Sequence, residues 1–551
     1  MAVIDGQRRQ FVTTQSAEHL DPEAPVQGGQ NPLIAINVFS RYGSMAITMV
    51  VGFLLTPFLI HAIGKTAYGL QSLSYQALEF TAMLALAVGI SYERIAAAYY
   101  ARGEYDRMNA TLSGGLILSL AIACIIALAT DFMVIFADTL FDLEVELQST
   151  ARWVLLIFGT GAMLQIINGV YQAPVFMTQR LYAESLGSLL SVVLPAAIVV
   201  PLFMFGHPSI ITWVALSVGA RLAVQWCFVI PLGRRGLHQL NIRLFAAGAR
   251  KEMGELVNFG GLALVGKLGV LLFYATDSIM ISHLNELGLD DVTNYNVAQR
   301  WFPQISMLAS GLVWILGPAM TTQVAMKRFD ELRTTVTKVT RYCFIILAYP
   351  SLLLILYSEP FLRYWLKSAF VPESVGVMRV IMCALLAGSA GLVSMEALYA
   401  CRKIRKAVIA TLIGGVLNVV LSIALVKVGG MGLLGIAVGS LVSLLLLQVV
   451  CMPLLLCHEI SLSYSVLMRG ALRALSGAIP LVGACLVLHY AWKPESLPQV
   501  FVQFLLCGLV YAPSAWFISM TASDRCELVS ATRTAWTSYR DRNRPAQGGA
   551  S

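Results

Sequence analysis

Long apolar stretches recur along most of this chain and constrain its fold more than any other feature. Runs of mostly apolar residues repeat from Leu33 to Met520 with only short polar breaks between them. Many reach the length of about 20 residues that a helix needs to cross a bilayer. Charged residues make up 12% of the sequence, about half their share in a typical soluble domain. The sequence therefore predicts an all-α, polytopic membrane protein.

We predict about 14 transmembrane helices, joined by connections too short to hold a soluble catalytic domain. The seven histidines are scattered, the ten cysteines show no metal-ligand spacing, and no phosphate loop of the ATP-binding type occurs. We therefore expect no enzyme activity, no cofactor and no metal site. The predicted spans are 34–62, 70–92, 109–131, 151–177, 185–205, 210–232, 257–283, 294–320, 341–358, 375–400, 407–427, 432–457, 469–490 and 499–520.

The basic residues are distributed unevenly between the two sets of connections. One set and the two tails hold most of the 38 lysines and arginines, while the alternate set carries an acidic cluster around Asp138 and Glu144. Lysine and arginine in short loops mark the cytoplasmic side of a membrane. This bias places both termini in the cytoplasm and accounts for the net charge of +8 without a nucleic-acid partner.

A weak internal repeat divides the chain. Thr66-Ala67-Tyr68 matches Thr293-Asn294-Tyr295, and the loop after Ala101 resembles the loop after Met326. Two like halves with the same orientation would be related by a pseudo-two-fold axis along the membrane normal, with the substrate path between them. We expect two pseudo-symmetric six-helix lobes plus a terminal helix pair. The predicted units are an N-terminal tail (1–33), an N-lobe (34–232), a linker (233–256), a C-lobe (257–457), a terminal helix pair (458–520) and a basic tail (521–551).

Two local patterns near the first hairpin resemble a known family. Gly64-Lys65-Thr66-Ala67-Tyr68-Gly69-Leu70 is similar to a turn pattern, "lG…yGl", of the multidrug/oligosaccharidyl-lipid/polysaccharide exporter superfamily. The stretch from Glu93 to Asp106 resembles the family's loop after its second span. The resemblance covers roughly Ile34 to Leu456 and, within the superfamily, is strongest to flippases of lipid-linked oligosaccharides in the bacterial inner membrane.

The resemblance implies a transporter that flips a polyprenyl-pyrophosphate-linked oligosaccharide by alternating access, for O-antigen, capsule or exopolysaccharide assembly. Its implied partners are that anionic lipid-linked oligosaccharide, membrane lipids, a polysaccharide polymerase and export proteins, and a coupling proton or sodium ion. A drug or cation antiporter of the same superfamily is the first alternative. A membrane enzyme of polysaccharide assembly is the second, and it would need a larger outer loop than this chain has.

Charged residues inside the predicted spans are the candidate site, because a charge in hydrocarbon is costly unless it faces protein or water. Lys267 and Arg300 lie well inside spans seven and eight, and Arg41 lies eight residues into the first apolar run. We predict that these three cations line a substrate cavity. For Arg41 the alternative is that its long side chain reaches the headgroups.

Three further charged residues are candidates for coupling or ion pairing. Asp277 and Arg300 lie at matched depths on either side of a short connection, so we predict that they form an ion pair or share a water. Glu79 and Arg221 both fall near mid-span in the first half. A structural ion pair between them and a role in transport are equally compatible with the sequence.

Overall fold

The computed structural model describes residues 32–141, 145–235, 237–244, 246, 248–284, 287–367, 371–401, 403–527 and 529–530. Inside helices, only the backbone is described at residues 32–35, 38, 79–87, 90, 258–263, 267, 274, 314, 315 and 318. In these parts every regular element is a helix. The all-α prediction is confirmed.

The first half of the chain runs up and down through helices joined by short turns. The turn between the first two helices is made by Gly64, whose φ of 88° suits a residue without a Cβ. The helices are α2 (Pro32–Ile63), α3 (Lys65–Ala101), α4 (Tyr105–Ile135), α5 (Ala137–Phe141), α6 (Val145–Met177), α7 (Leu181–Phe205), α8 (Ile210–Val224), η1 (Gln225–Val229) and α9 (Ile230–Arg234).

The second half and the terminal helices follow the same plan. Their bounds are α10 (Ala249–Tyr274), α11 (Thr276–His283), α12 (Leu289–Gln299), α13 (Trp301–Ala325), α14 (Phe329–Leu356), α15 (Ser358–Leu366), α16 (Glu373–Ala387), α17 (Ser389–Ala400), α18 (Ile404–Lys427), α19 (Gly432–Leu444), η3 (Leu445–Cys451), α20 (Met452–Ile460), α21 (Tyr464–Ser476), α22 (Ile479–Ala491), α23 (Leu497–Ser514) and η4 (Ala515–Ser519). Each predicted span coincides with one of these helices or with consecutive helices.

Ten helices or helix pairs are long and apolar enough to cross a membrane, and two bent pairs bring the number of candidate spans in the described residues to twelve. The bent pairs are Leu264–Phe273 with Thr276–His283, and Glu373–Ala387 with Ser389–Ala400. The predicted spans 70–92 and 294–320 lie on α3 and on α12–α13, which are not among the candidates. Both carry polar residues that lower their hydropathy, and side chains in both are only partly described.

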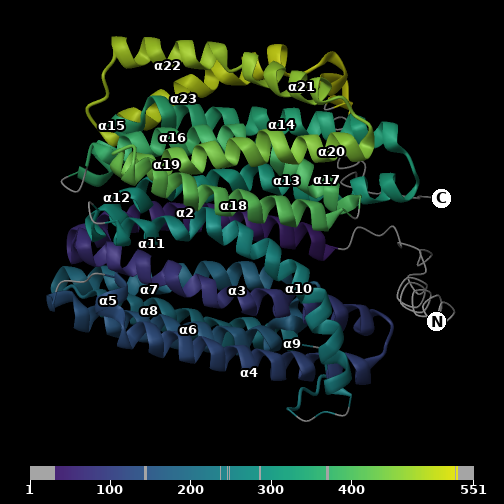
Figure 1. Ribbon diagram of the computed structural model, residues 1–551. Coiled ribbons are helices and arrows are strands. Elements are labelled where there is room, and N and C mark those ends of the chain that lie inside the picture. Colours follow the sequence, from purple (N-terminus) through teal and green to yellow (C-terminus); the bar gives the residue numbers. More distant parts are fainter. Residues whose placement is uncertain are drawn as a thin grey trace, which may run out of the picture.

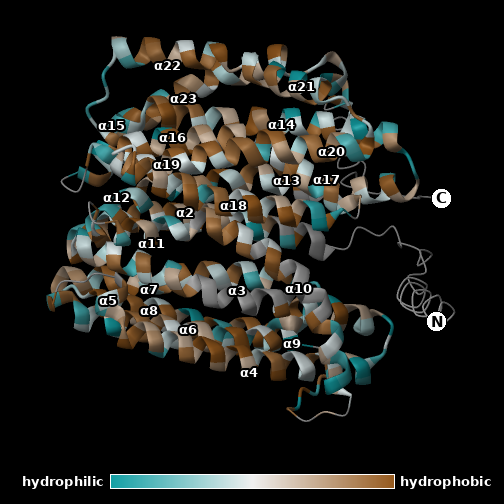
Figure 2. Cartoon of the chain, in the orientation of Figure 1, coloured by the Kyte–Doolittle hydropathy of each residue, from teal (hydrophilic) through white to brown (hydrophobic). Residues whose placement is uncertain are grey.

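The helices run roughly parallel to one axis and form two groups (Figure 1). Helices α3 to α9 make up one group and α13 to α23 the other, with α2, α10 and α11 between them. Hydrophobic residues cover the lengths of the helices, and hydrophilic residues gather toward their ends (Figure 2). Helix α2, the first described helix, begins at the end of the bundle where η4 finishes (Figure 1). We call this end the tail side and the other end the opposite side.

Candidate functional site

The two halves of the chain meet at the opposite side through the first turns of α3 and α12. Thr66 Oγ1 donates a 2.7 Å hydrogen bond to Oδ1 of Asp290, and Thr293 Oγ1 donates a 2.6 Å bond to the carbonyl oxygen of Lys65. Asp290 and Asp291 lie in the first turn of α12, where the helix dipole favours negative charge. Each threonine of the repeated sequence motif therefore donates a hydrogen bond to a residue just before the other copy of the motif.

A close backbone approach accompanies these bonds. A Cβ on Gly69 would lie 2.1 Å from the carbonyl oxygen of Leu289, so only glycine lets α3 and α12 pack at this distance. The contact is therefore built into the backbone as well as into polar side chains.

One layer further toward the tail side, three polar side chains form a closed network. Gln76 Nε2 on α3 donates to Ser278 Oγ at 2.7 Å and to Asn296 Oδ1 at 2.9 Å. Asn296 Nδ2 donates to the same Ser278 Oγ at 3.0 Å. The network joins the first half to both α11 and α12. In a low-dielectric region such bonds hold two surfaces together and are costly to break without water.

Arg300 lies close to the middle of the bundle at the junction of α12 and α13. Its Nη1 is 3.4 Å from the Tyr68 hydroxyl oxygen, and its Nη2 lies against Gly52, where a Cβ would come within 2.5 Å. Both Gly52 and Arg300 are about 16 Å along their helices from the opposite side, roughly half of a 30 Å hydrocarbon core. Among the described residues no carboxylate lies within ion-pair distance of Arg300.

Asp277 is fully buried near the bend between α10 and α11. Its Oδ2 accepts hydrogen bonds from the Tyr295 hydroxyl at 2.6 Å and from Gln299 Nε2 at 3.3 Å. Its Oδ1 is buried and accepts no hydrogen bond from the described residues. A cavity of about 10 Å³ adjoins Asp277, Gln299 and Ser440, which is about the space of one water molecule.

The described residues show no ion pair between Asp277 and Arg300, and the predicted alternative, a shared water, stays a prediction. The two residues lie at similar depths, but Asp277 contacts Tyr295 and Gln299, whereas Arg300 points toward Tyr68 and Gly52. Successive residues of a helix are about 100° apart around its axis, so Gln299 and Arg300 present different faces. Counting residues from the helix ends predicted how deep each charged residue lies in the bundle. It did not predict which way each side chain points around its helix axis.

The other predicted site residues do not join this cluster in the described structure. Arg41 is exposed on α2, about 16 Å along the helix from Gly52, and Arg221 is exposed on α8. The side chains of Glu79 and Lys267 lie outside the described residues, and only the helical backbone is placed there. The cavity roles of Arg41 and Lys267, and the pairing of Glu79 with Arg221, stay predictions.

Sequence reasoning missed the uncharged members of the site, namely Tyr68, Gln76, Ser278, Tyr295, Asn296 and Gln299. A signal for them was present. Tyr295 with Gln299, and Asn296 with Arg300, are spaced by four residues and so share helix faces, in a stretch much less apolar than its neighbours. Groups of three or more histidine, cysteine, aspartate or glutamate side chains able to hold a metal are absent from the described residues.

Comparisons with known proteins agree with this architecture. A family model described as MatE matches residues 263–424. An "Uncharacterized membrane protein EpsK" from Bacillus subtilis is 23% identical over 499 residues, which cover 89% of this chain and 96% of that protein.

Solved structures share the fold at low sequence identity. "Lipid II flippase MurJ, inward closed conformation" matches with a TM-score of 0.63 at 13% identity, covering 87% of this chain and 98% of that one. An inward-facing multidrug resistance MATE family transporter matches with a TM-score of 0.62 at 16% identity, covering 79% and 98%. An outward-facing structure with the same description gives 0.55 at 17% identity, covering 80% and 97%.

The fold, with its candidate spans and two halves that meet through polar contacts at one side of the bundle, is that of a polytopic membrane protein. The chain shares the fold of MATE and MurJ transporters, matches the MatE family model over residues 263–424, and is similar to EpsK along most of its length.

Proposed function

We propose that this transporter flips a polyprenyl-pyrophosphate-linked oligosaccharide across the bacterial inner membrane for cell-surface polysaccharide assembly. The observation that carries the proposal is Arg300, a cation near mid-membrane whose only hydrogen-bond partner among the described residues is the Tyr68 hydroxyl. A half-buried guanidinium without a counter-ion among the described residues favours an anionic ligand, since a phosphate can take a forked pair of its N–H donors. The fold it shares with a lipid II flippase supports the same substrate class.

The contacts at the opposite side support a proposal of alternating access. The bonds between α3 and α12, and the network around Gln76, hold that side closed. Opening it requires that all these bonds break, so substrate binding at Arg300 must shift the balance between the two states. Both tails face the cytoplasm in this proposal, and the oligosaccharide is delivered to a polymerase and to export proteins on the other side.

Asp277 is the proposed coupling residue. Its Oδ1 has no partner among the described residues, and the adjoining cavity is large enough for one small cation or water. A proton or sodium ion bound there would compensate the buried carboxylate. Because Asp277 and Arg300 lie on different faces, coupling acts through the α11–α12 hairpin and not through direct competition between the two charges.

The proposal is tested with the purified protein in vesicles that contain a fluorescent polyprenyl-pyrophosphate oligosaccharide. A membrane-impermeant reductant quenches only the label on the outer leaflet, so flipping appears as additional quenching. Wild type should flip the lipid, Arg300→Ala should not, and Arg300→Lys should retain part of the rate because the charge stays but the forked geometry is lost. Arg152→Ala, which breaks only a surface pair with Asp138, is the matched control. Full flipping by Arg300→Ala would refute the role of the guanidinium.

A drug or cation antiporter is the second candidate, and the buried carboxylate of Asp277 is the observation in its favour. The same vesicles distinguish the two functions. If they expel a cationic dye in response to a proton or sodium gradient and do not flip the lipid, the antiporter is correct.

A further inference from the structure

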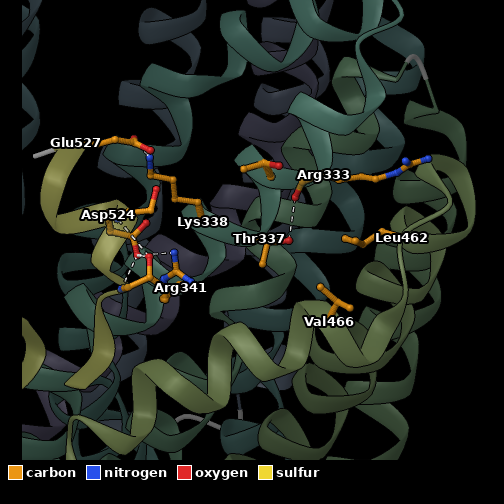
Figure 3. Close-up of a pocket in the computed structure, with 11 residues that line it drawn as sticks. Arg333, Thr337, Lys338, Arg341, Leu462, Val466, Asp524 and Glu527 are labelled. Carbon is orange, nitrogen blue, oxygen red and sulfur yellow. Dashed lines mark hydrogen bonds and ion pairs between the residues drawn. The ribbon is translucent and has the colours of Figure 1, made fainter. Parts of the chain in front are cut away.

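A pocket of about 350 Å³ opens at the tail side between α14, the start of α21 and the C-terminal segment, residues 521–527 (Figure 3). Arg333, Thr337 and Arg341 are spaced by four residues on α14, so they line one face of that helix. Lys338 adds a third basic side chain to the lining. Arg300 and its partner Tyr68 are not among the residues that line the pocket.

Two ion pairs fasten the C-terminal segment to this face (Figure 3). Arg341 Nη2 lies 2.5 Å from Asp524 Oδ2, and both side chains are almost fully buried. Lys338 pairs with Glu527, whose side chain is 58% exposed. The first pair is structural, because breaking a buried pair strands a charge. The second is a surface pair of the kind that contributes little stability, so Lys338 can exchange its partner.

The pocket keeps unused cationic donors. Nε of Arg341 is buried without a hydrogen-bond partner in the described residues. Arg333 donates from Nε to the carbonyl oxygen of Ile460 and from Nη1 to Asp330, which leaves Nη2 without a partner among the described residues. The lining has three basic and two acidic side chains, and Asp330, outside the lining, pairs with Arg333. The N–H donors that remain without partners among the described residues suit an anionic ligand such as a phosphodiester.

The pocket also lies near the ends of three candidate spans. Two candidate spans begin beside it, Phe329–Leu356 and Tyr464–Ala491, and a third ends just before the C-terminal segment. Leu462 and Val466 form an apolar part of the wall. Further along the same span, Leu472 and Ile479 are 65% and 68% exposed, so apolar surface continues from the pocket toward the hydrocarbon.

We propose that this pocket binds the phosphodiester headgroup of an anionic membrane phospholipid, with Arg333 and Lys338 as its main contacts. The acyl chains lie along the exposed apolar side chains of α21 and α22. The lipid thereby links α14 to the terminal helices at the tail side. Nothing in this inference depends on which substrate the transporter carries.

The test is a titration of the detergent-purified full chain with phosphatidylglycerol, with binding followed by native mass spectrometry. Lys338→Gln should weaken binding about fivefold, the effect of one basic residue near a charged headgroup, and Lys338→Arg should restore it. Glu527→Gln is the matched control, because it breaks the same ion pair but leaves the cation in place. Its affinity should equal or exceed that of wild type.

Equal losses in Lys338→Gln and Glu527→Gln would show a purely structural ion pair and overturn the proposal. Arg333→Gln leaves both ion pairs to the C-terminal segment intact, and it should also weaken lipid binding. This variant therefore tests the proposal even if Lys338→Gln does not fold. Diacylglycerol, which lacks the phosphate, should not bind. If glycerol 3-phosphate alone binds as tightly as the lipid, the site takes a soluble phosphate ester and the lipid assignment is wrong.

Discussion

The hydroxyl of Tyr295 on α12 donates a 2.6 Å hydrogen bond to Oδ2 of Asp277 on α11, and both side chains are fully buried. The bond ties the two arms of the α11–α12 hairpin together at the bend of a candidate span. Each hydrogen-bond donor contributes strongly to the stability of a buried carboxylate, because no water is available to replace a lost donor.

Tyr295→Phe should therefore destabilise the protein by about 1–3 kcal/mol, the cost of leaving a buried acceptor with one bond fewer. The measurement is the thermal unfolding midpoint in detergent. Tyr490→Phe, at a side chain that is 79% exposed, should leave the midpoint unchanged. An equal midpoint for both variants would show that the Asp277 bond contributes nothing.

Gly52→Ala should impair transport more than stability. The new methyl group would lie 2.5 Å from Arg300 Nη2, the mobile end of a long side chain, so the guanidinium moves and the fold survives. We expect lipid flipping to fall to about the level of Arg300→Lys while the unfolding midpoint stays near that of wild type. The control is Gly43→Ala on the same helix, where no atom lies within 4 Å of the added methyl.

Gly69→Ala should weaken the closed contact at the opposite side, because its Cβ would collide with the backbone of Leu289. The readout is disulfide formation between Thr66→Cys and Asp290→Cys, which lie at a hydrogen-bonded contact, in a protein whose four exposed cysteines are replaced by serine. Cross-linking should be efficient without the Gly69 change and much lower with it. Gly254→Ala, with open space around its Cβ, should have no effect.

Acidification should release the C-terminal segment. Burial raises the pKa of Asp524, but the hydrogen bonds from Thr521 and the Arg341 guanidinium outweigh it and hold the pKa below its ordinary value. A lowered pKa in the folded state contributes stability above the ordinary value of about 3.9, and that contribution is lost as the pH falls through the folded value. Hydrogen-exchange protection factors of residues 521–527, corrected for the intrinsic rate at each pH, should therefore fall at low pH, and Asp524→Asn should show low protection factors at every pH.

Reporter fusions test the orientation that the basic loops predict. Fusions after Lys251 and Arg405 should read as cytoplasmic and a fusion after Glu144 as external. An external signal after Lys251 would reverse the predicted orientation of the tail side.

The sequence alone was sufficient for the helices and insufficient for the site. In a membrane, a long apolar segment is stable as a helix, because a helix satisfies its own backbone hydrogen bonds. Every predicted span accordingly coincides with helical structure. The charges were harder to place. Asp277 and Arg300 are at the predicted depths, but their partners are decided by rotation about the helix axis and by neighbours distant in sequence, such as Tyr68 for Arg300.

Polar neutral residues were the main omission. Gln76 and Asn296 are unremarkable in the sequence, and their role appears only when α3 and α12 come together. The repeated Thr-x-Tyr motif pointed to the correct two segments. It did not indicate that these two segments lie side by side. A sequence repeat predicts that two segments occupy equivalent positions in the two halves, but not that they are in contact.

The bonds from Thr66 to Asp290 and from Thr293 to Lys65 link the two halves of the chain without being equivalent to each other. Thr66 donates to a side chain, and Thr293 donates to a main-chain carbonyl oxygen. A substitution at Asp290 can therefore remove the first acceptor, whereas no side-chain substitution at Lys65 removes the second. Loss of the Asp290 carboxylate would leave the closed side held by the main-chain contact, so the two halves of the chain can be loosened at this contact one bond at a time.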